Sequence, residues 1–301
     1  MGEFQSIGQW WMWASFGLFV IAMLAIDILA LDRKGAHKVS TKEALVWSLI
    51  WFTLALAFGG ALWAWLDHTS GRAIADAKAM EYLTGYLLEK TLAMDNIFVF
   101  VMLFTYFAVP MEYQKRVLVY GVLGAIILRA LMILLGAWLI AEFHWVLYVF
   151  GAFLLVTGIK MFIFADKEPN LAQNPLLKWL KKHMRITDTY HGDKFWVTKN
   201  GVRWFTPMFL VLILVEFSDV IFAMDSIPAI FAITSDPFIV FTSNIFAILG
   251  LRALYFLLAD MADRFHLLKY GLAVVLMFVG TKMLIVEWFK IPVAVSLAVV
   301  V

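Results

Sequence analysis

The sequence predicts an all-α polytopic membrane protein with about nine transmembrane helices, the last of them truncated. The chain of 301 residues is 63% hydrophobic and 15% charged, whereas soluble domains are about 45–50% apolar and about 25% charged. Its apolar residues form long blocks, unlike the short alternating strands of an outer-membrane barrel. Local segments also recur in order along the chain. Composition therefore excludes a soluble enzyme, a nucleic-acid-binding domain and a disordered chain.

Each block of about 20 apolar residues is long enough to cross the bilayer as a helix. The first block follows a start that contains Glu3 and no Lys or Arg, so it lacks the basic region of a signal peptide and is expected to remain as a span. The stretch 291–301 is too short to cross alone and is interpreted as the start of a ninth span. The other expected spans are 8–31, 44–66, 82–107, 117–141, 145–165, 206–232, 238–259 and 267–287.

The spans divide the chain into five parts. These are two N-terminal spans (1–81), a first three-helix repeat (82–165), a loop (166–205), a second repeat (206–290) and the start of the ninth span (291–301).

Lys and Arg are concentrated in alternate loops, and this asymmetry predicts the orientation. The loops after the first, third, fifth and seventh spans contain most of them, while the opposite side has Arg72, Lys78 and Lys290. Because basic loops stay in the cytoplasm, we expect the N-terminus outside and the 166–205 loop and the C-terminus inside.

The long loop contains two local patterns. Segment 174–184 alternates apolar residues and Lys at helical spacing, which predicts an amphipathic helix on the inner leaflet or, as an alternative, a solvated helix. Segment 195–206 has Asn200-Gly201 between two β-rich runs, which predicts a small structural hairpin.

Internal similarity divides the membrane region into two copies of one unit. The paired segments are LAMDNI (92–97) with FAMDSI (222–227), LRAL (128–131) with LRAL (251–254), and GIKM (158–161) with GTKM (280–283). The matches occur in the same order, so spans 3–5 and spans 6–8 are interpreted as repeats. The predicted orientation makes them inverted, an architecture typical of secondary transporters.

The first helix of each repeat contains most of the acidic residues inside the spans. An Asp at the bilayer centre costs ~2.5–3.5 kcal/mol on the insertion scale, so such residues usually face a partner or a water-filled path. Without Cys or a central His, the ligands are hard oxygens, which suit Mg²⁺, Ca²⁺ or Mn²⁺. The candidate ligands are Glu89, Asp95, Asn96, Glu216, Asp219, Asp225 and Ser226.

The spacing of these acids leaves two arrangements open. Glu89 and Asp95 are six positions apart, as are Asp219 and Asp225, so each pair is separated by ~120° around its helix. The two members of a pair converge on one ion only if the helix bends or unwinds between them. The alternative is that each helix contributes to two stations along a path.

Basic residues inside the repeats are candidates for ion pairing or gating. Arg129 and Arg252 occupy equivalent positions and are expected to pair with the carboxylates, as a fixed strut rather than a gate. Lys90 follows the first acid and is expected to neutralise it, while Lys160 and Lys282 are expected to reach the interface. The acids outnumber these pairing bases by a charge of two, which matches one divalent cation and argues against a purely structural ion-pair network.

The signature segments resemble those of the TerC family. These are Glu89–Ile97 (EKTLAMDNI) and Val215–Ala229 (VEFSDVIFAMDSIPA), and the wider run, with 120–124 and 236–240, is similar to its Alx-like branch. The resemblance implies a multi-pass protein of the bacterial inner membrane that exports Mn²⁺. It also implies that the ion is carried by Glu89, Asp95, Glu216, Asp219 and Asp225.

The expected function is therefore transport of a divalent cation, with Mn²⁺ as substrate, no permanently bound cofactor and no enzymatic step. A clustered acid can exchange a proton for a cation, so proton coupling is one way to drive export. The expected partners are the metal ion and the lipid bilayer, without nucleic acid. The alternatives are a Ca²⁺ or other cation/proton exchanger and a metal-delivery adaptor for exported proteins, working with the protein-export machinery or exported metalloproteins.

Overall fold

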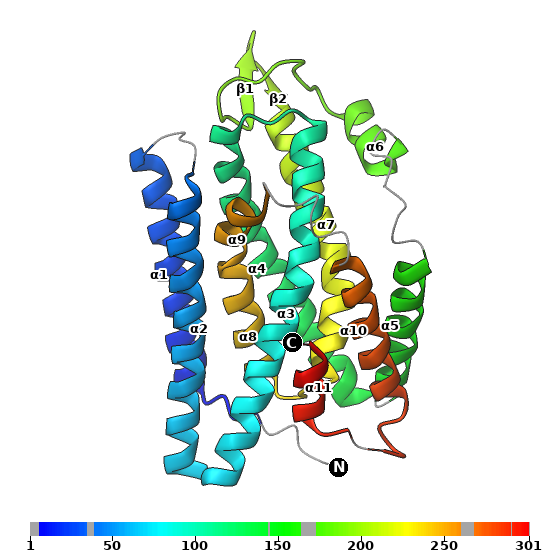
Figure 1. Cartoon of the computed structure of the whole chain (residues 1–301). Helices are drawn as coiled ribbons and strands as arrows, with labels where there is room; N and C mark the ends of the chain where they lie inside the picture. Colours follow the sequence, from blue (N-terminus) through cyan, green and yellow to red (C-terminus); the bar gives the residue numbers. More distant parts are fainter. Residues whose placement is uncertain are drawn as a thin grey trace.

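The computed structural model describes residues 6–34, 39–143, 145–163, 173–259, 268–289 and 291–300, and the side chains of 27–34 and 268–269 lie outside this description. The described chain is mostly helical, which confirms the all-α class (Figure 1). The helices are α1 (Trp10–Lys34), α2 (Thr41–Ser70), α3 (Arg72–Tyr106), α4 (Met111–Glu142), α5 (Val146–Ile163), α6 (Pro175–His183), α7 (Pro207–Phe231), α8 (Pro237–Leu249), α9 (Leu251–Leu258), α10 (Leu268–Leu284) and α11 (Val293–Val300), with strands β1 (Trp196–Lys199) and β2 (Val202–Phe205).

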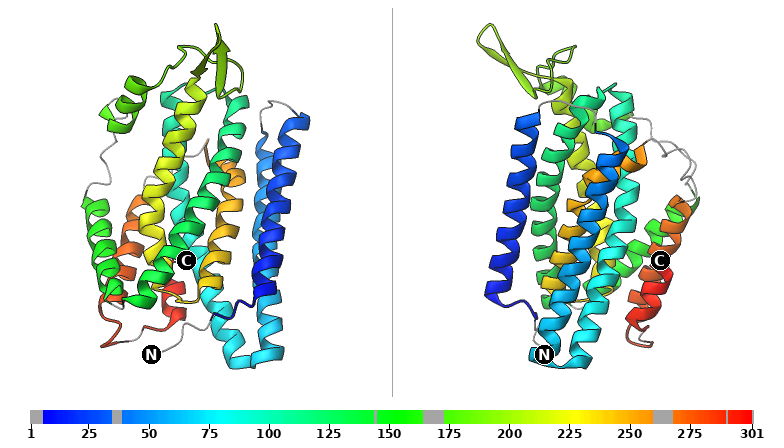
Figure 2. Two further views of the ribbon diagram at one scale, coloured as in Figure 1. Left: turned by 180° about the vertical axis from the view of Figure 1, so that it is seen from behind. Right: turned by 60° about the vertical axis from the view of Figure 1, so that its left-hand side comes forward.

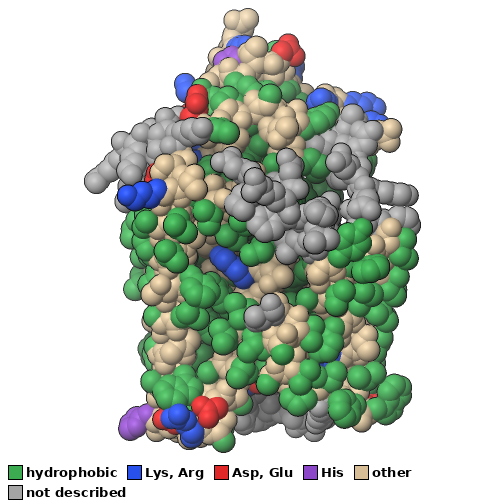
Figure 3. Space-filling view, in the orientation of Figure 1, with side chains coloured by type: hydrophobic (Ala, Val, Ile, Leu, Met, Phe, Trp, Pro, Cys, Tyr) green, Lys and Arg blue, Asp and Glu red, His purple; other side chains and the backbone are tan. Residues whose placement is uncertain are grey.

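Five helical segments are long and apolar enough to cross a membrane: α2, α4, α5, α7 and the segment formed by α8 and α9. Shorter apolar helices lie within α1 and α10. The helix α3 is long and continuous, but its apolar sequence is interrupted by charged residues such as Glu89, Lys90 and Asp95. Apolar side chains cover most of the molecular surface in Figure 3, and charged side chains gather mainly at its two ends. Each expected span falls on a helix, and the polytopic membrane class is confirmed.

The span expected at 82–107 begins earlier than the hydropathy suggests. A sharp turn at Gly71 (φ 89°) joins α2 directly to α3. Arg72 then forms ion pairs with Asp67 and Asp76, each with an N–O distance of 3.4 Å, at the exposed tip of this pair of helices. The first turns of α3 are therefore polar and lie beyond the apolar part of the helix.

The span expected at 238–259 is divided into two helices. Gly250 separates α8 from α9. A Cβ atom at this position would meet the Lys90 Nζ atom and the Trp51 side chain. The glycine therefore leaves room for a basic side chain of α3 at the helix break.

Helices α3 and α7 form the centre of the bundle. Helix α3 packs against α2, α7 and α8, while α7 also packs against α4 and α5. The α1–α2 pair lies on one side and the α5–α10 pair on the other (Figures 1 and 2). Helices α3 and α7 run in opposite directions (Figure 1), as inverted units require, and the equivalence of the two three-helix units stays a prediction.

The hairpin expected around Asn200-Gly201 is confirmed. Strands β1 and β2 pair antiparallel, and Asn200 (φ 53°) and Gly201 (φ 74°) form the turn between them. Both positive φ angles belong to the two-residue turn that suits the twist of a hairpin. The Tyr190 hydroxyl donates to the Phe107 carbonyl over 2.6 Å, and Arg116 pairs with Asp193 over 2.5 Å. These contacts hold the loop against the ends of α3 and α4.

Helix α6 confirms the helix expected in segment 174–184. Asn174 caps its first turn by accepting from the backbone N–H groups of Leu176 and Leu177. Leu177 and Leu180 are buried in an apolar cluster that includes Met208 of α7. Leu177 and Leu180 therefore pack on the protein, so the helix is not wholly solvated, while Trp179 is 55% exposed. Its position at the inner leaflet stays a prediction.

The α5–α10 pair is held by direct backbone contact at glycine positions. A Cβ atom on Gly280 would lie 2.6 Å from the Leu155 backbone nitrogen and 2.8 Å from the Gly151 carbonyl oxygen. A Cβ atom on Gly158 would lie 2.9 Å from the Ala273 carbonyl oxygen. Small residues allow helix backbones to approach closely in membranes. The glycines of the GIKM and GTKM segments thus each face the partner helix, Gly158 at Ala273 and Gly280 at Gly151 and Leu155.

We expect Gly280→Ala to destabilise the protein, because the new methyl group meets backbone atoms that cannot rotate away. Overpacking of this kind costs about 1–3 kcal/mol, which corresponds to a fall in Tm on the order of 5 °C. Gly271→Ala on the same helix is the matched control, since a Cβ atom there meets nothing within 4 Å. Thermal unfolding of the purified variants measures both effects, and equal Tm values would contradict the close contact.

Candidate functional site

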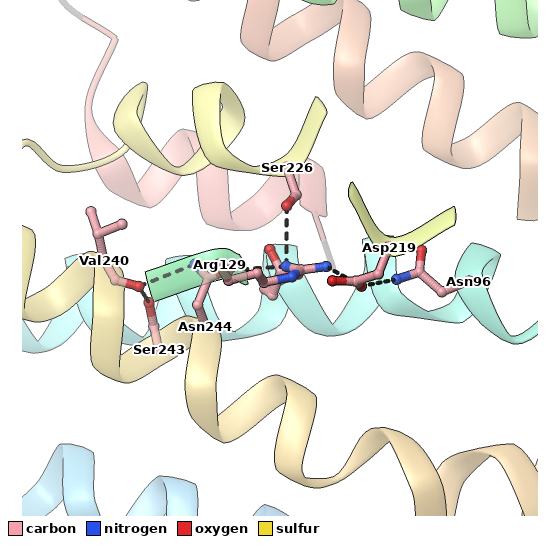
Figure 4. A network of polar contacts seen from close by, with 8 residues as sticks. Asn96, Arg129, Asp219, Ser226, Val240, Ser243 and Asn244 are labelled. Carbon is pink, nitrogen blue, oxygen red and sulfur yellow. Dashed lines mark hydrogen bonds and ion pairs between the residues drawn. The ribbon is translucent and has the colours of Figure 1, made fainter. Parts of the chain in front are cut away.

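The largest polar cluster of the bundle centre is organised by Arg129. This residue projects from α4 and is 1% exposed. Its guanidinium donates to the Glu89 carboxylate on α3 and, over 3.2 Å, to Asp219 Oδ1 on α7. It also donates over 3.1 Å each to Ser226 Oγ on α7 and Asn244 Oδ1 on α8. Figure 4 shows this side chain between α7 and α8.

Asn96 extends the cluster along α3. Its side-chain amide donates to Asp219 Oδ1 over 3.5 Å (Figure 4). Glu89, Asn96, Asp219 and Ser226 are all buried. The structure therefore brings four of the candidate ligands together with one of the candidate basic residues. Arg129 pairs with two carboxylates, as a strut between α3, α4 and α7 would.

Three oxygen atoms of this cluster have no hydrogen-bond donor among the described residues. They are Glu89 Oε2, Asn96 Oδ1 and Asp219 Oδ2. A buried acceptor without a donor costs about 1–3 kcal/mol, and more if the group is charged. Two carboxylates accept hydrogen bonds from one guanidinium, and a second arginine, Arg252, lines a small cavity beside Asp219. Buried hard oxygens without a donor are suited to a cation or a proton.

A small cavity adjoins the same cluster. It has a volume of about 10 Å³ and its lining includes Asp219, Arg252, Gly121 and Val215. Such a volume corresponds to about one water-sized probe. Arg252 therefore lies beside Asp219, on the opposite repeat from Arg129.

Asp95 and Asp225 lie on a different face of the α3–α7 pair. They are close enough for the charge of Asp95 to act on Asp225, and Thr157 of α5 is within hydrogen-bonding range of Asp225. Both α3 and α7 are continuous helices through these positions. Across the described ranges, no three acidic or histidine side chains converge in the manner of a metal site. The geometry is that of two separate stations rather than one site at an unwound helix.

Glu216 lies close enough to Asp219 for the two charges to interact. Its carboxylate occupies the space beside Gly124 on α4, where any larger residue would collide with it. Asp219 is one turn further along α7. Glu216 therefore lies between α4 and α7, on the same helix as Asp219.

Two of the expected roles of lysines are wrong. Glu89 is neutralised by Arg129, whereas the Lys90 Nζ atom lies against Gly250. Neighbouring helical residues are rotated by 100°, so Lys90 leaves α3 in another direction. Lys282 is buried and donates to Ser296 of α11 over 2.9 Å, so it does not reach the interface. Lys160 is exposed, as expected.

Sequence reasoning did not identify Asn244 or Thr157. Asn244 accepts from Arg129 and donates to its own helix at the Val240 carbonyl. An amide within an otherwise apolar span was the available signal for it. Thr157 had no such signal, because a threonine in a membrane helix usually bonds its own backbone.

Comparison with known proteins assigns the family. The family described as "Integral membrane protein TerC family" matches residues 74–301, which is more than half of the chain. This chain belongs to the TerC family. It is 59% identical over 295 residues to proteins named "Putative membrane-bound redox modulator Alx" from Shigella flexneri and Escherichia coli strain K12, covering 98% of this chain and 92% of each relative.

A more distant relative of this TerC-family protein comes from Myxococcus xanthus. It is named "Uncharacterized membrane protein STKORF319" and is 49% identical over 300 residues, covering 100% of this chain and 91% of the relative. No solved structure matches the chain. The family membership confirms an integral membrane protein and, with the apolar helices, a multi-pass one.

Proposed function

We propose that this TerC-family protein transports a divalent metal cation across the membrane, with Mn²⁺ as substrate. The observation that carries the proposal is the set of orphaned oxygens in the Arg129 cluster: Glu89 Oε2, Asn96 Oδ1 and Asp219 Oδ2. Ionisable residues inside a membrane are expensive to bury and usually mark ion pathways. Carboxylate and amide oxygens are ligands of Mn²⁺, Mg²⁺ and Ca²⁺.

The two polar faces of the α3–α7 pair supply two stations for the ion. The first combines Glu89, Asn96 and Asp219 around Arg129, and the second combines Asp95 with Asp225. Arg129 holds the carboxylates of the first station, those of Glu89 and Asp219, in position inside the bundle while no cation is bound. A cation bound to the carboxylates of a station, or protons in its place, keeps that station stable inside the bilayer.

Alternating access would come from movement of the two three-helix units around this centre. Helices α3 and α7, the first helices of these units, run in opposite directions and contact each other (Figure 1). In transporters with inverted repeats, the substrate site lies between the repeats near the midplane. Proton entry in exchange for the cation is the coupling we propose, because clustered carboxylates take up protons when a cation leaves.

The orientation follows from the distribution of basic residues. The hairpin end of the bundle includes Lys178, Lys181, Lys182, Arg185 and Lys194, and the positive-inside rule places such an end in the cytoplasm. This puts the N-terminus outside the bacterial inner membrane. The direction of transport, export, rests on the resemblance of the signature segments.

Mn²⁺ flux into proteoliposomes tests the proposal. We expect Asn96→Leu to lower the flux roughly tenfold or more, because it removes an oxygen ligand without changing the charge of the cluster. Thr84→Val is the matched control, since Thr84 is buried on the same helix and bonds only its own turn, at the Met80 carbonyl. Flux no greater than in protein-free vesicles, or unchanged by Asn96→Leu, would refute the proposal.

Competition by other cations separates the closest alternative. Ca²⁺ takes more oxygens at longer distances than the smaller cations do, so a Ca²⁺ exchanger would show Ca²⁺ inhibiting Mn²⁺ flux more strongly than Mn²⁺ inhibits Ca²⁺ flux. A metal-delivery adaptor would bind metal and an exported protein without catalysing flux. The relatives' name suggests a redox role, which we rank below cation transport. The sequence contains no cysteine and so offers no thiol–disulfide reaction.

A further inference from the structure

A second cavity lies at the hairpin end of the bundle, far from the Arg129 cluster. Its volume is about 750 Å³. The lining comes from the end of α3, from α6 and the segment after it, from β2 and from the start of α7. These elements meet at the same end of the molecule in Figures 1 and 2. No residue of the two stations takes part in this cavity.

One part of the lining is apolar and another is basic. Phe107, Ile186 and Pro207 supply apolar surface, while Lys181 and Arg185 supply two positive charges. Among the residues that the structure describes, neither basic side chain forms an ion pair, although Asp188 also lines the cavity. An amphipathic space with two uncompensated cations is suited to an amphipathic anion.

The neighbouring aromatic residues mark the depth of the cavity in the membrane. Trp204 lines it, and Trp179 on α6 is 55% exposed. Tryptophan is enriched where hydrocarbon meets the headgroups. Tyr190 also lines the cavity, and burial raises the pKa of its hydroxyl. The phenol therefore stays neutral and adds no negative charge to the site.

We infer that this cavity binds the phosphate headgroup of an anionic phospholipid. The phosphate would lie between Lys181 and Arg185, and the glycerol and first methylenes would lie against Phe107 and Ile186. Arg matches phosphate geometry with its planar fork, and Lys provides a point charge. Basic pockets at this end of membrane proteins bind anionic headgroups. The bound lipid joins α6 to the ends of α3 and α7, independently of any transported ion.

Native mass spectrometry of the purified full chain with phosphatidylglycerol tests this inference. Each basic side chain near an anionic surface contributes about fivefold, so Lys181→Gln with Arg185→Gln should weaken binding about thirtyfold. Lys181→Gln alone should weaken it about fivefold, and Lys181→Arg with Arg185→Lys should retain it. Lys178→Gln with Lys199→Gln removes the same charge from the same end without touching the lining, and should leave binding unchanged.

Two further probes distinguish the source of the phosphate. Phosphatidylcholine should bind weakly and equally to all variants, because its headgroup has no net charge. Millimolar inorganic phosphate should not displace phosphatidylglycerol, because it lacks the apolar part. Displacement by inorganic phosphate would identify a pocket for a free anion and overturn the lipid assignment. Equal phosphatidylglycerol binding by the double variant and its control would overturn the site itself.

Discussion

Arg129→Gln is expected to be among the most destabilising single substitutions in this TerC-family protein. It leaves Glu89 and Asp219 buried without the guanidinium that both carboxylates contact. Removing one partner of a buried ion pair costs about 3–5 kcal/mol, because the remaining charge is uncompensated. The expected result is a large fall in Tm and in the yield of monodisperse protein, measured by fluorescence-detected size-exclusion chromatography after heating.

Neutralising the acids as well should restore much of the lost stability. The triple variant Arg129→Gln, Glu89→Gln, Asp219→Asn replaces the charges with amides of similar size, and such replacement is often close to neutral in free energy. Arg72→Gln is the control for removing an arginine, because its ion pairs with Asp67 and Asp76 are exposed and exposed pairs contribute about 0–1 kcal/mol. A single variant as stable as the wild type, or a triple variant no better than the single, would contradict the role of Arg129 as a strut.

The positions of the membrane helices were predictable because hydropathy reports directly on burial in lipid. The break at Gly250 was not, since hydropathy is continuous across α8 and α9. The Lys90 side chain, from another helix, occupies the space where a Cβ atom on this glycine would lie, and a single sequence does not show that contact. The contact of α6 with α7 was not predictable for a related reason. An amphipathic pattern shows that one face of a helix is covered by apolar material. The pattern is the same whether the lipid bilayer or another helix, here α7, covers that face.

The acidic residues of the candidate site were predictable from their cost inside a membrane, and their partners only in part. Helical spacing indicated that Glu89 and Asp95 face different directions, which left two stations open as an alternative to one site. The structure has two faces because α3 and α7 stay helical there. Adjacency in sequence suggested that Lys90 neutralises Glu89, but the rotation of the helix separates them. Asn244 and Thr157 depend on packing between helices, which one sequence does not show.

Asp225→Asn is expected to abolish most Mn²⁺ flux while leaving thermal stability unchanged or higher. Asp225 lies near Asp95, and two like charges in a poorly solvated place repel each other. The amide keeps the size of the side chain and its ability to hydrogen-bond Thr157. The loss of a charged ligand should lower flux roughly tenfold or more. Flux in proteoliposomes and Tm in detergent measure the two effects on the same preparation.

Asp219→Asn provides the comparison that separates the two stations. It should also lower Mn²⁺ flux, but it removes a carboxylate that contacts Arg129, so it should lower Tm. Hydrogen bonds to charged groups contribute about 1.5–3 kcal/mol. If Asp219 and Asp225 belonged to one cation site of excess negative charge, neutralising either would relieve the same repulsion and change Tm in the same direction. Opposite signs of the Tm shift, with loss of flux in both variants, require two stations whose carboxylates have different neighbours: Asp219 contacts Arg129, whereas Asp225 lies near a second carboxylate, Asp95.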